Sequence, residues 1–282
     1  MKLARIGAAG SEKPAILDSE GAYRDLSPII SDLDGPHIED MSWAETLDID
    51  SLDILDPGLR IGPCVGSIGK LVCVGLNYSD HAAETGAKIP AEPILFGKAT
   101  SSIIGPNDNV VIPKGSRKTD WEVELGVVIG RETRYVSEQD AMAHVAGYCV
   151  VNDVSERSFQ IERSGQWIKG KSADTFAPIG PWLVTRDEVP DPQKLGMWLK
   201  VDGATRQNGS TGTMIFPVKT LVSYISQFMS LQPGDVIPTG TPPGVGMGMK
   251  PPRFLEAGQV MELGVEGLGT QRQQVVAWSG TG

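Results

Sequence analysis

The decapeptide DWEVELGVVI (residues 120–129) is an apolar segment with two carboxylates, and it decides the fold of this chain. We interpret it as a strand, on which successive side chains point to opposite faces. Glu122 and Glu124 are therefore predicted to lie side by side, with Val123 and Leu125 on the other face. Two like charges in a dry site favour protonation or a bound cation. An isolated Glu-x-Glu is more often the polar face of a half-exposed strand.

A second acidic element favours the cation. The run YCVVND (residues 148–153) is apolar until its last two residues, which are Asn and Asp. This pattern is typical of a buried strand whose end lies at a site. If residues 154–161 are helical, Asp153, Arg157 and Gln160 fall on one face. Three carboxylates with no His or Cys nearby are hard oxygen ligands, which suit Mg²⁺, Mn²⁺ or Ca²⁺ rather than zinc. The two glutamates and this aspartate therefore predict a divalent-metal site.

These motifs carry a resemblance to a known family. Residues 121–125, 152–160 and 170–181 (GKSADTFAPIGP) resemble, in order, the signature series of the fumarylacetoacetate hydrolase family. Within it, the sequence is most similar to bacterial members that act on sugar-derived 2,4-diketo acids such as 2,4-diketo-3-deoxy-L-rhamnonate. The resemblance implies an α+β fold: a mixed β-roll or β-barrel core, flanking short helices and a small N-terminal β subdomain. It also implies a homodimer.

The resemblance assigns roles residue by residue. It implies that Mg²⁺ or Mn²⁺ is held by Glu122, Glu124 and Asp153, and that the substrate is surrounded by Arg157, Gln160 and Lys171. Lys171 would bind a carboxylate or a developing enolate oxygen. The loop TGTPPGVGMG (residues 239–248) resembles the family's substrate-carboxylate loop, with Thr241 as the contact. It is no nucleotide-binding phosphate loop, because Lys250 is followed by Pro rather than Ser or Thr.

The segment NYSDHAAE (residues 77–84), after the apolar run 70–76, supplies a candidate general base. A helix here would make His81 and Glu84 neighbours, and the carboxylate would orient the imidazole and raise its basicity toward water. From the residues alone, an ordinary histidine at a solvated helix end is the alternative. The resemblance to the family's His-Glu dyad favours catalysis. Residues 84–93, which contain two prolines, are expected to form a mobile lid.

Charge is concentrated in the N-terminal part. The net charge is -10, and residues 1–60 hold 13 acids against 5 bases. An acidic chain without a basic stripe argues against nucleic-acid binding. Because prolines interrupt residues 27–60, we predict a small N-terminal subdomain over 1–65 and a catalytic domain over 66–282. Lys98 could contact an acidic ligand, although a surface lysine is the commoner interpretation.

Cysteine usage and hydropathy indicate the compartment. Cys64, Cys73 and Cys149 lack CxxC spacing, which predicts reduced core thiols. The N-terminus has no apolar signal region, and no run approaches 18 apolar residues, so the cytoplasm is the expected location.

The expected activity is metal-dependent hydrolysis of a 2,4-diketo acid. His81, oriented by Glu84, would activate water to attack C4, and cleavage between C3 and C4 would leave a pyruvate enolate. Arg157, Gln160 and Thr241 would position the substrate. One alternative is decarboxylation or keto-enol isomerisation of a 2-oxo acid with the same metal grip. Another is a binding or structural protein in which the carboxylate cluster only holds metal to stabilise the fold.

Overall fold

The computed structural model describes residues 1–280, with the side chain of Thr85 left out, and its centre is strand β9 (Val123–Ile129). β9 pairs antiparallel with β10 (Val145–Asn152) and β15 (Val236–Pro238). All seven residues of β9 are buried, so the half-exposed alternative is wrong. The predicted strand is confirmed over most of its length, with Glu122 immediately before β9.

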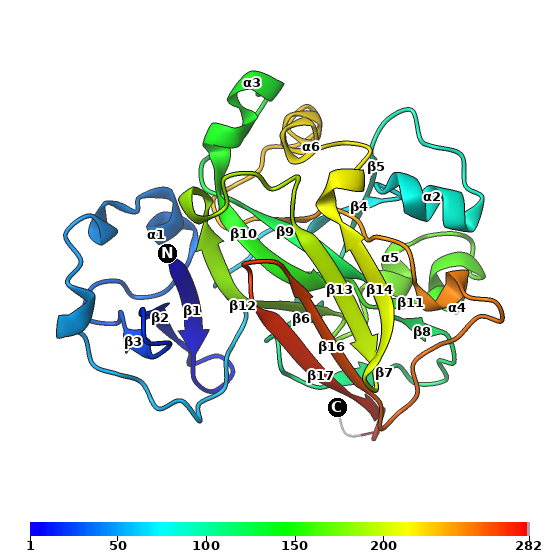
Figure 1. Cartoon of the computed structure of the whole chain (residues 1–282), viewed down its shortest axis with the longest axis horizontal. Coiled ribbons are helices and arrows are strands. Elements are labelled where there is room, and N and C mark those ends of the chain that lie inside the picture. The colour runs from blue at the N-terminus through cyan, green and yellow to red at the C-terminus, as the bar shows by residue number, and fades with distance from the viewer. Residues whose placement is uncertain (281–282) are drawn as a thin grey trace.

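The main sheet has eight strands and carries the N-terminal residues at one end. Its order is β15-β9-β10-β12-β1-β2-β3, and β6 pairs in parallel with β12. The remaining strands are β1 (Lys2–Ile6), β2 (Lys13–Leu17), β3 (Tyr23–Asp25), β6 (Ile103–Ile104) and β12 (Ala177–Thr185). β1 pairs antiparallel with β12, and the blue N-terminal strands lie at the left of the molecule (Figure 1).

A second sheet of five strands has the order β14-β13-β16-β17-β7. Its strands are β7 (Val110–Ile112), β13 (Gly196–Val201), β14 (Ala204–Ser210), β16 (Val260–Val265) and β17 (Thr270–Ala277). Two smaller ladders join β4 (Val72–Gly75) to β5 (Ile94–Gly97) and β8 (Thr119–Asp120) to β11 (Ser155–Glu156).

The core lies on both faces of β9 and β10. Leu125 packs in one cluster with Leu199 and Leu263 of the second sheet. Val128 and Val151 pack in another cluster that includes N-terminal residues. Burial on both faces explains why these strands are continuous apolar runs in the sequence.

The helices are short. They are α1 (Gly35–Glu39), α2 (Ser79–Thr85), α3 (Glu138–Ala141), α4 (Arg157–Ile161), α5 (Ile168–Lys171) and α6 (Val218–Ile225). Single 3-10 turns are η1 (Ser42–Ala44), η2 (Ile49–Ser51), η3 (Thr100–Ser102), η4 (Met142–His144), η5 (Arg186–Glu188), η6 (Thr211–Thr213) and η7 (Gly246–Gly248). Mixed sheets with few helices confirm the α+β class. The β-roll or β-barrel description and the domain boundary at residue 65 stay predictions.

Two further expectations concern cysteines and membranes. Cys64, Cys73 and Cys149 are buried and free, which confirms the reduced thiols. Among residues 1–280, none of the helices is both long and apolar enough to cross a membrane.

Candidate active site

Strand pairing brings the three predicted metal ligands together. In the β9–β10 ladder Glu124 lies opposite Val151, and Asp153 directly follows the end of β10. The backbone N–H of Asp153 donates to the carbonyl of Glu122 at 2.9 Å, so the two side chains leave the backbone side by side. All three residues are buried, and one carboxylate oxygen from each lies within 4.8 Å of the others.

The buried Lys171 links two of these carboxylates, and the buried Arg157 pairs with one of them. Lys171 Nζ lies 2.6 Å from Glu122 Oε2 and 2.6 Å from Asp153 Oδ2. Arg157 Nη2 lies 2.6 Å from Glu122 Oε1. Within the described part of the chain Glu124 has no ion pair, and one of its oxygens accepts from the backbone N–H of Gly240 at 2.9 Å.

This uneven pairing moves the pKa values of the two glutamates in opposite directions. Burial raises the pKa of Glu124 well above its ordinary value, and the charges of Asp153 and Glu122 raise it further. Burial would also raise the pKa of Glu122, but Arg157 and Lys171 outweigh that effect and hold the pKa well below its usual range. The raised pKa favours the protonated form of Glu124, and a further cation beside it would favour the carboxylate.

The donor set fits a divalent metal. The three residues offer carboxylate oxygens only, which Mg²⁺ and Mn²⁺ accept as ligands. A metal at this position would also supply the positive charge that Glu124 lacks. The residues that would hold it are the three predicted from sequence.

The helix that carries Arg157 and Gln160 is shorter than expected. α4 begins at Arg157, so the prediction of a helix over residues 154–161 is wrong for its first part. The reason is that Ser155 and Glu156 pair with β8, and the Glu156 side chain then caps α4. Arg157 and Gln160 still share a face, with Arg157 Nη1 donating to Gln160 Oε1 at 3.0 Å.

Asp120 is a site residue that the sequence analysis did not single out. Its Oδ2 accepts from Arg157 Nε at 2.8 Å and from the backbone N–H of Met247 at 3.0 Å. Its Oδ1 accepts from the backbone N–H of Trp121 at 2.9 Å and of Gly246 at 2.7 Å. This fully buried carboxylate thus ties Arg157 to the glycine-rich loop of residues 239–248.

Lys98 is a second addition, and its assignment to the surface is wrong. The residue is buried, and its Nζ lies 2.5 Å from Asp153 Oδ1 and 3.0 Å from the carbonyl of Val154. Lys98 follows directly after β5, so it shares with Asp153 the signal of a charged residue at the end of a strand. That signal could have identified it.

The predicted dyad is formed on α2. His81 Nδ1 lies 3.2 Å from Glu84 Oε2, and His81 is buried while the Glu84 side chain is partly exposed. The backbone N–H of Gly244 lies 3.1 Å from both oxygens of Glu84. The dyad therefore contacts the same loop that Asp120 holds.

Thr241 lines the site, but its hydroxyl is largely engaged. Thr241 Oγ1 donates to the carbonyl of Val123 at 2.8 Å and accepts from Gln207 Nε2 at 2.7 Å. Because the hydroxyl proton of Thr241 is already donated and one lone pair is occupied by Gln207, Oγ1 has only one lone pair left. That lone pair can accept a hydrogen bond from a donor but cannot bind a carboxylate. Thr241 as the carboxylate contact stays a prediction that its hydroxyl does not favour. Gln207, whose segment had no assigned role, also accepts from the backbone N–H of Val123 at 2.9 Å and fixes this geometry.

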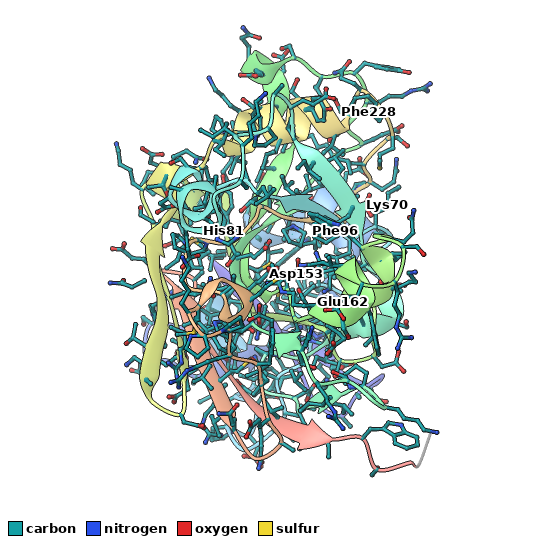
Figure 2. The ribbon with its side chains drawn as sticks, turned by 90° about the vertical axis from the view of Figure 1, so that its right-hand side faces the viewer. Lys70, His81, Phe96, Asp153, Glu162 and Phe228 are labelled. Atoms are coloured by element: carbon teal, nitrogen blue, oxygen red, sulfur yellow. The ribbon has the colours of Figure 1, made fainter. Side chains whose placement is uncertain are left out.

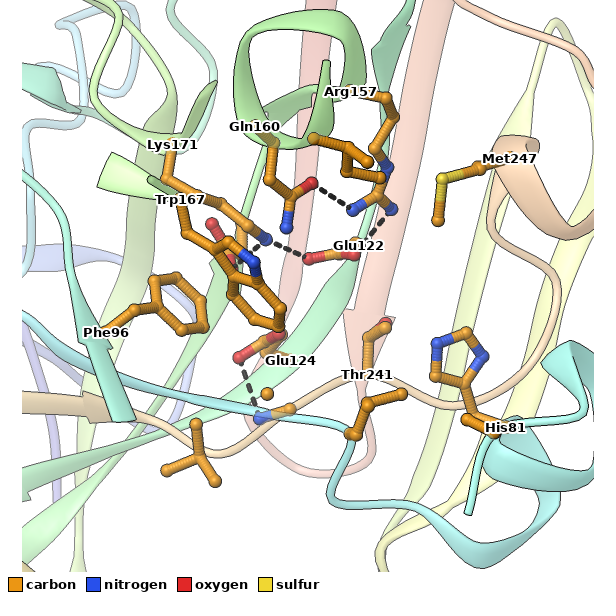
Figure 3. A pocket seen from close by; sticks show the side chains of 17 residues that line it. His81, Phe96, Glu122, Glu124, Arg157, Gln160, Trp167, Lys171, Thr241 and Met247 are labelled. Atoms are coloured by element: carbon orange, nitrogen blue, oxygen red, sulfur yellow. Dashed lines mark hydrogen bonds and ion pairs between the residues drawn. The ribbon is translucent and has the colours of Figure 1, made fainter. Parts of the chain in front are cut away.

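These residues converge on one cavity of about 220 Å³. Of the predicted site residues, the cavity is lined by His81, Glu122, Glu124, Asp153, Arg157, Gln160, Lys171 and Thr241, whereas Glu84 stands behind His81. The labels of His81, Phe96 and Asp153 lie close to one another in the middle of Figure 2. Figure 3 shows His81 across the pocket from Phe96 and Trp167.

The family model "Fumarylacetoacetate (FAA) hydrolase C-terminal" matches residues 70–276. This chain belongs to the fumarylacetoacetate hydrolase family. The resemblance read from the sequence motifs is thereby confirmed at the level of the family.

Several family members are similar over almost the whole chain. A Burkholderia lata protein named "putative hydrolase" is 62% identical, covering 97% of this chain and 98% of its own. The fumarylacetoacetate hydrolase of psychrophilic Exiguobacterium antarcticum is 35% identical, with a TM-score of 0.89 and coverage of 99% and 100%. A 2-hydroxyhepta-2,4-diene-1,7-dioate isomerase from Mycobacterium marinum is 34% identical, with a TM-score of 0.78 and coverage of 100% of both chains.

A more distant family member was solved with ligands. Maleylpyruvate hydrolase from Sphingobium sp. SYK-6, in complex with manganese(II) and pyruvate, is 25% identical, with a TM-score of 0.82 and coverage of 98% and 99%. The family thus includes a hydrolase with a divalent metal and an isomerase, and the buried acidic triad of this chain could bind such a metal.

Proposed function

We propose that this chain is a divalent-metal-dependent hydrolase that cleaves the C3–C4 bond of a 2,4-diketo acid and releases pyruvate. The observation that carries the proposal is one small cavity lined by a carboxylate triad and by the histidine of a His-Glu dyad. The triad suits the chelating pyruvoyl end of the substrate, and the dyad suits the activation of water.

Each residue has a defined task in this reaction. The carboxylate and 2-oxo group of the substrate would meet Arg157 and Gln160, whose side chains are held together at 3.0 Å. His81 would take a proton from water as the oxygen attacks C4. Lys171 would donate to the enolate oxygen as the C3–C4 electron pair moves onto the pyruvoyl fragment, and C3 then takes up a proton. A bound Mg²⁺ or Mn²⁺ would supply Lewis-acid polarisation of the 2-oxo group.

The substrate we propose is 2,4-diketo-3-deoxy-L-rhamnonate, which would give pyruvate and L-lactate in sugar catabolism. The water oxygen is added to C4, so the lactoyl fragment (C4 to C6) leaves as lactate and the pyruvoyl fragment (C1 to C3) leaves as pyruvate. One water molecule therefore accounts for all atoms of the two products. The maleylpyruvate hydrolase relative, solved with manganese(II) and pyruvate, supports the metal and the pyruvoyl grip. We also propose a homodimer, which sedimentation equilibrium would test.

The test is pyruvate release from this sugar acid and from acetylpyruvate, with and without chelator. His81→Ala should lower turnover at least ~100-fold, the range of general-base catalysis. His144→Ala is the matched control, because His144 lies in η4, contacts Thr133 and does not line the cavity. Unchanged hydrolysis by His81→Ala would refute its role as the base.

A second candidate is keto-enol isomerisation or decarboxylation of a 2-oxo acid with the same metal grip. The 34% identical isomerase relative favours this alternative. Neither reaction involves an attack by water on C4. Loss of the diketo-enol absorbance without release of pyruvate would therefore support isomerisation. Release of carbon dioxide from oxaloacetate would identify the decarboxylase.

A further inference from the structure

The cavity has a cluster of charged side chains around the triad, and most of its remaining wall is apolar. Besides the metal triad and the cations Arg157 and Lys171, the polar side chains that line it are His81, Gln160 and Thr241. The rest of the wall is apolar or backbone and consists of Val74, Gly75, Leu76, Ala87, Phe96, Ile161, Trp167, Gly240 and Met247. A substrate held at the triad by its carboxylate and 2-oxo group would therefore extend its far end along an apolar wall.

The buried charges of the site are close to balance. The site holds four buried carboxylates, Asp120, Glu122, Glu124 and Asp153, and three buried cations, Lys98, Arg157 and Lys171, which pair with all of these carboxylates except Glu124. Fully ionised, this group carries one net negative charge. A divalent metal changes it to one net positive charge, which a single substrate carboxylate cancels. A second carboxylate would leave a net negative charge in a buried site.

The existing cations cannot serve that second carboxylate. Arg157 and Lys171 are engaged with Glu122, Asp120 and Asp153 at the metal end. No other lysine or arginine lines the cavity within residues 1–280. A carboxylate at the far end would be desolvated against apolar side chains such as Met247, with no lysine or arginine to pair with.

We propose that this site selects 2-oxo acids with an uncharged acyl tail and discriminates against congeners with a carboxylate at the far end. The inference rests on the proposed function for the direction in which the substrate lies. The remaining lone pair of Thr241 Oγ1 accepts a hydroxyl donor, so a hydroxylated neutral tail is compatible with the wall. The small volume of about 220 Å³ favours a short tail.

Binding tests this selectivity without turnover. Calorimetry with the Mn²⁺-loaded protein would compare 2-oxoheptanoate with 2-oxoheptanedioate, which have equal chain length and lack the 4-keto group required for cleavage. We expect the diacid to bind about 100-fold more weakly, because its second carboxylate is desolvated without a partner. Equal or tighter binding of the diacid would overturn the proposal.

A charge added to the wall should reverse the preference. Ile161 ends α4, lines the cavity and is 50% exposed, so the fold tolerates a polar side chain there. Ile161→Arg should tighten diacid binding about tenfold, whereas the uncharged control Ile161→Gln should not. If neither variant changes the ratio, the far end of the ligand does not reach this wall and the proposal fails.

The exposed Lys88 could bring a cation to the ligand by movement of its loop. If the wild-type protein prefers the diacid and Lys88→Gln abolishes that preference, the loop supplies the missing charge and our proposal is wrong.

Turnover of 2,4-dioxoheptanoate and 2,4-dioxoheptanedioate separates the proposed tail selectivity from the proposed hydrolase activity. If the protein binds the monoacid selectively but releases no pyruvate, the proposed hydrolase activity is refuted and the proposed selectivity is not. Equal cleavage of both would refute only the selectivity.

Discussion

Replacing Asp120 by Asn tests whether this residue positions the site. All four groups that contact its carboxylate are donors: Arg157 Nε and the backbone N–H groups of Trp121, Gly246 and Met247. An asparagine must place its NH₂ at one of the two oxygen positions. Two donors then face another donor whichever way the amide turns.

The cost follows from those contacts. With the NH₂ at the Oδ1 position, the N–H groups of Trp121 and Gly246 lose their acceptor. At the Oδ2 position, Arg157 and Met247 lose theirs. A buried donor without a partner costs about 1–3 kcal/mol, so the free energy of unfolding of Asp120→Asn should fall by roughly 3 kcal/mol. The loss of charge also weakens the hold on Arg157.

Two measurements check this prediction. Urea unfolding should show the lost stability, and kcat/KM should fall about 100-fold, because a small displacement of the arginine misplaces the substrate. Asp174→Asn is the control, because Asp174 is exposed and its loss should change neither quantity. A stability within about 0.5 kcal/mol of wild type, together with unchanged turnover, would refute the reasoning.

Three further outcomes are expected. In the presence of chelator, the melting temperature should fall as the pH rises above the ordinary carboxyl range, because the raised pKa of Glu124 makes the folded state bind more protons than the unfolded state. Glu124→Gln should make the melting temperature depend less on pH. Mn²⁺ should stabilise the wild-type protein more at pH 8 than at pH 5. Lys98→Met should lose about 3 kcal/mol in urea unfolding and bind Mn²⁺ more weakly, because it leaves a buried oxygen of Asp153 unpaired. Gly244→Ala should impair turnover, because its Cβ would lie 1.9 Å from a backbone carbonyl at a φ of +103°, whereas Gly258→Ala, at a φ of +98° with open space around it, should not.

The metal triad could be predicted because its information is local. Strand alternation predicts that Glu122 and Glu124 share a face, and Asp153 stands where an apolar run ends. The dyad was equally accessible, because His81 and Glu84 lie three residues apart on one helix. Periodicity and spacing within a short segment were sufficient for both.

Asp120, Lys98 and Gln207 were harder to find because their partners are far away in the sequence. Lys98 meets Asp153 across 55 residues, and Gln207 meets Thr241 across 34. The end of β5 marks Lys98 as a candidate, but the local pattern does not specify which distant residue Lys98 or Gln207 contacts. The start of α4 was misplaced for the same reason, since Ser155 and Glu156 pair with a strand that lies outside their own segment.

The pairing of β1 with β12 also has a consequence for the protein's solubility. The family model begins at residue 70, but strands β1 to β3 lie before it and continue the main sheet beyond β12. Without them, one side of β12 would expose unpaired N–H and C=O groups beside apolar surface, which is a template for intermolecular strand pairing. The N-terminal strands therefore protect the sheet edge, and a chain trimmed to the family-matched part should aggregate.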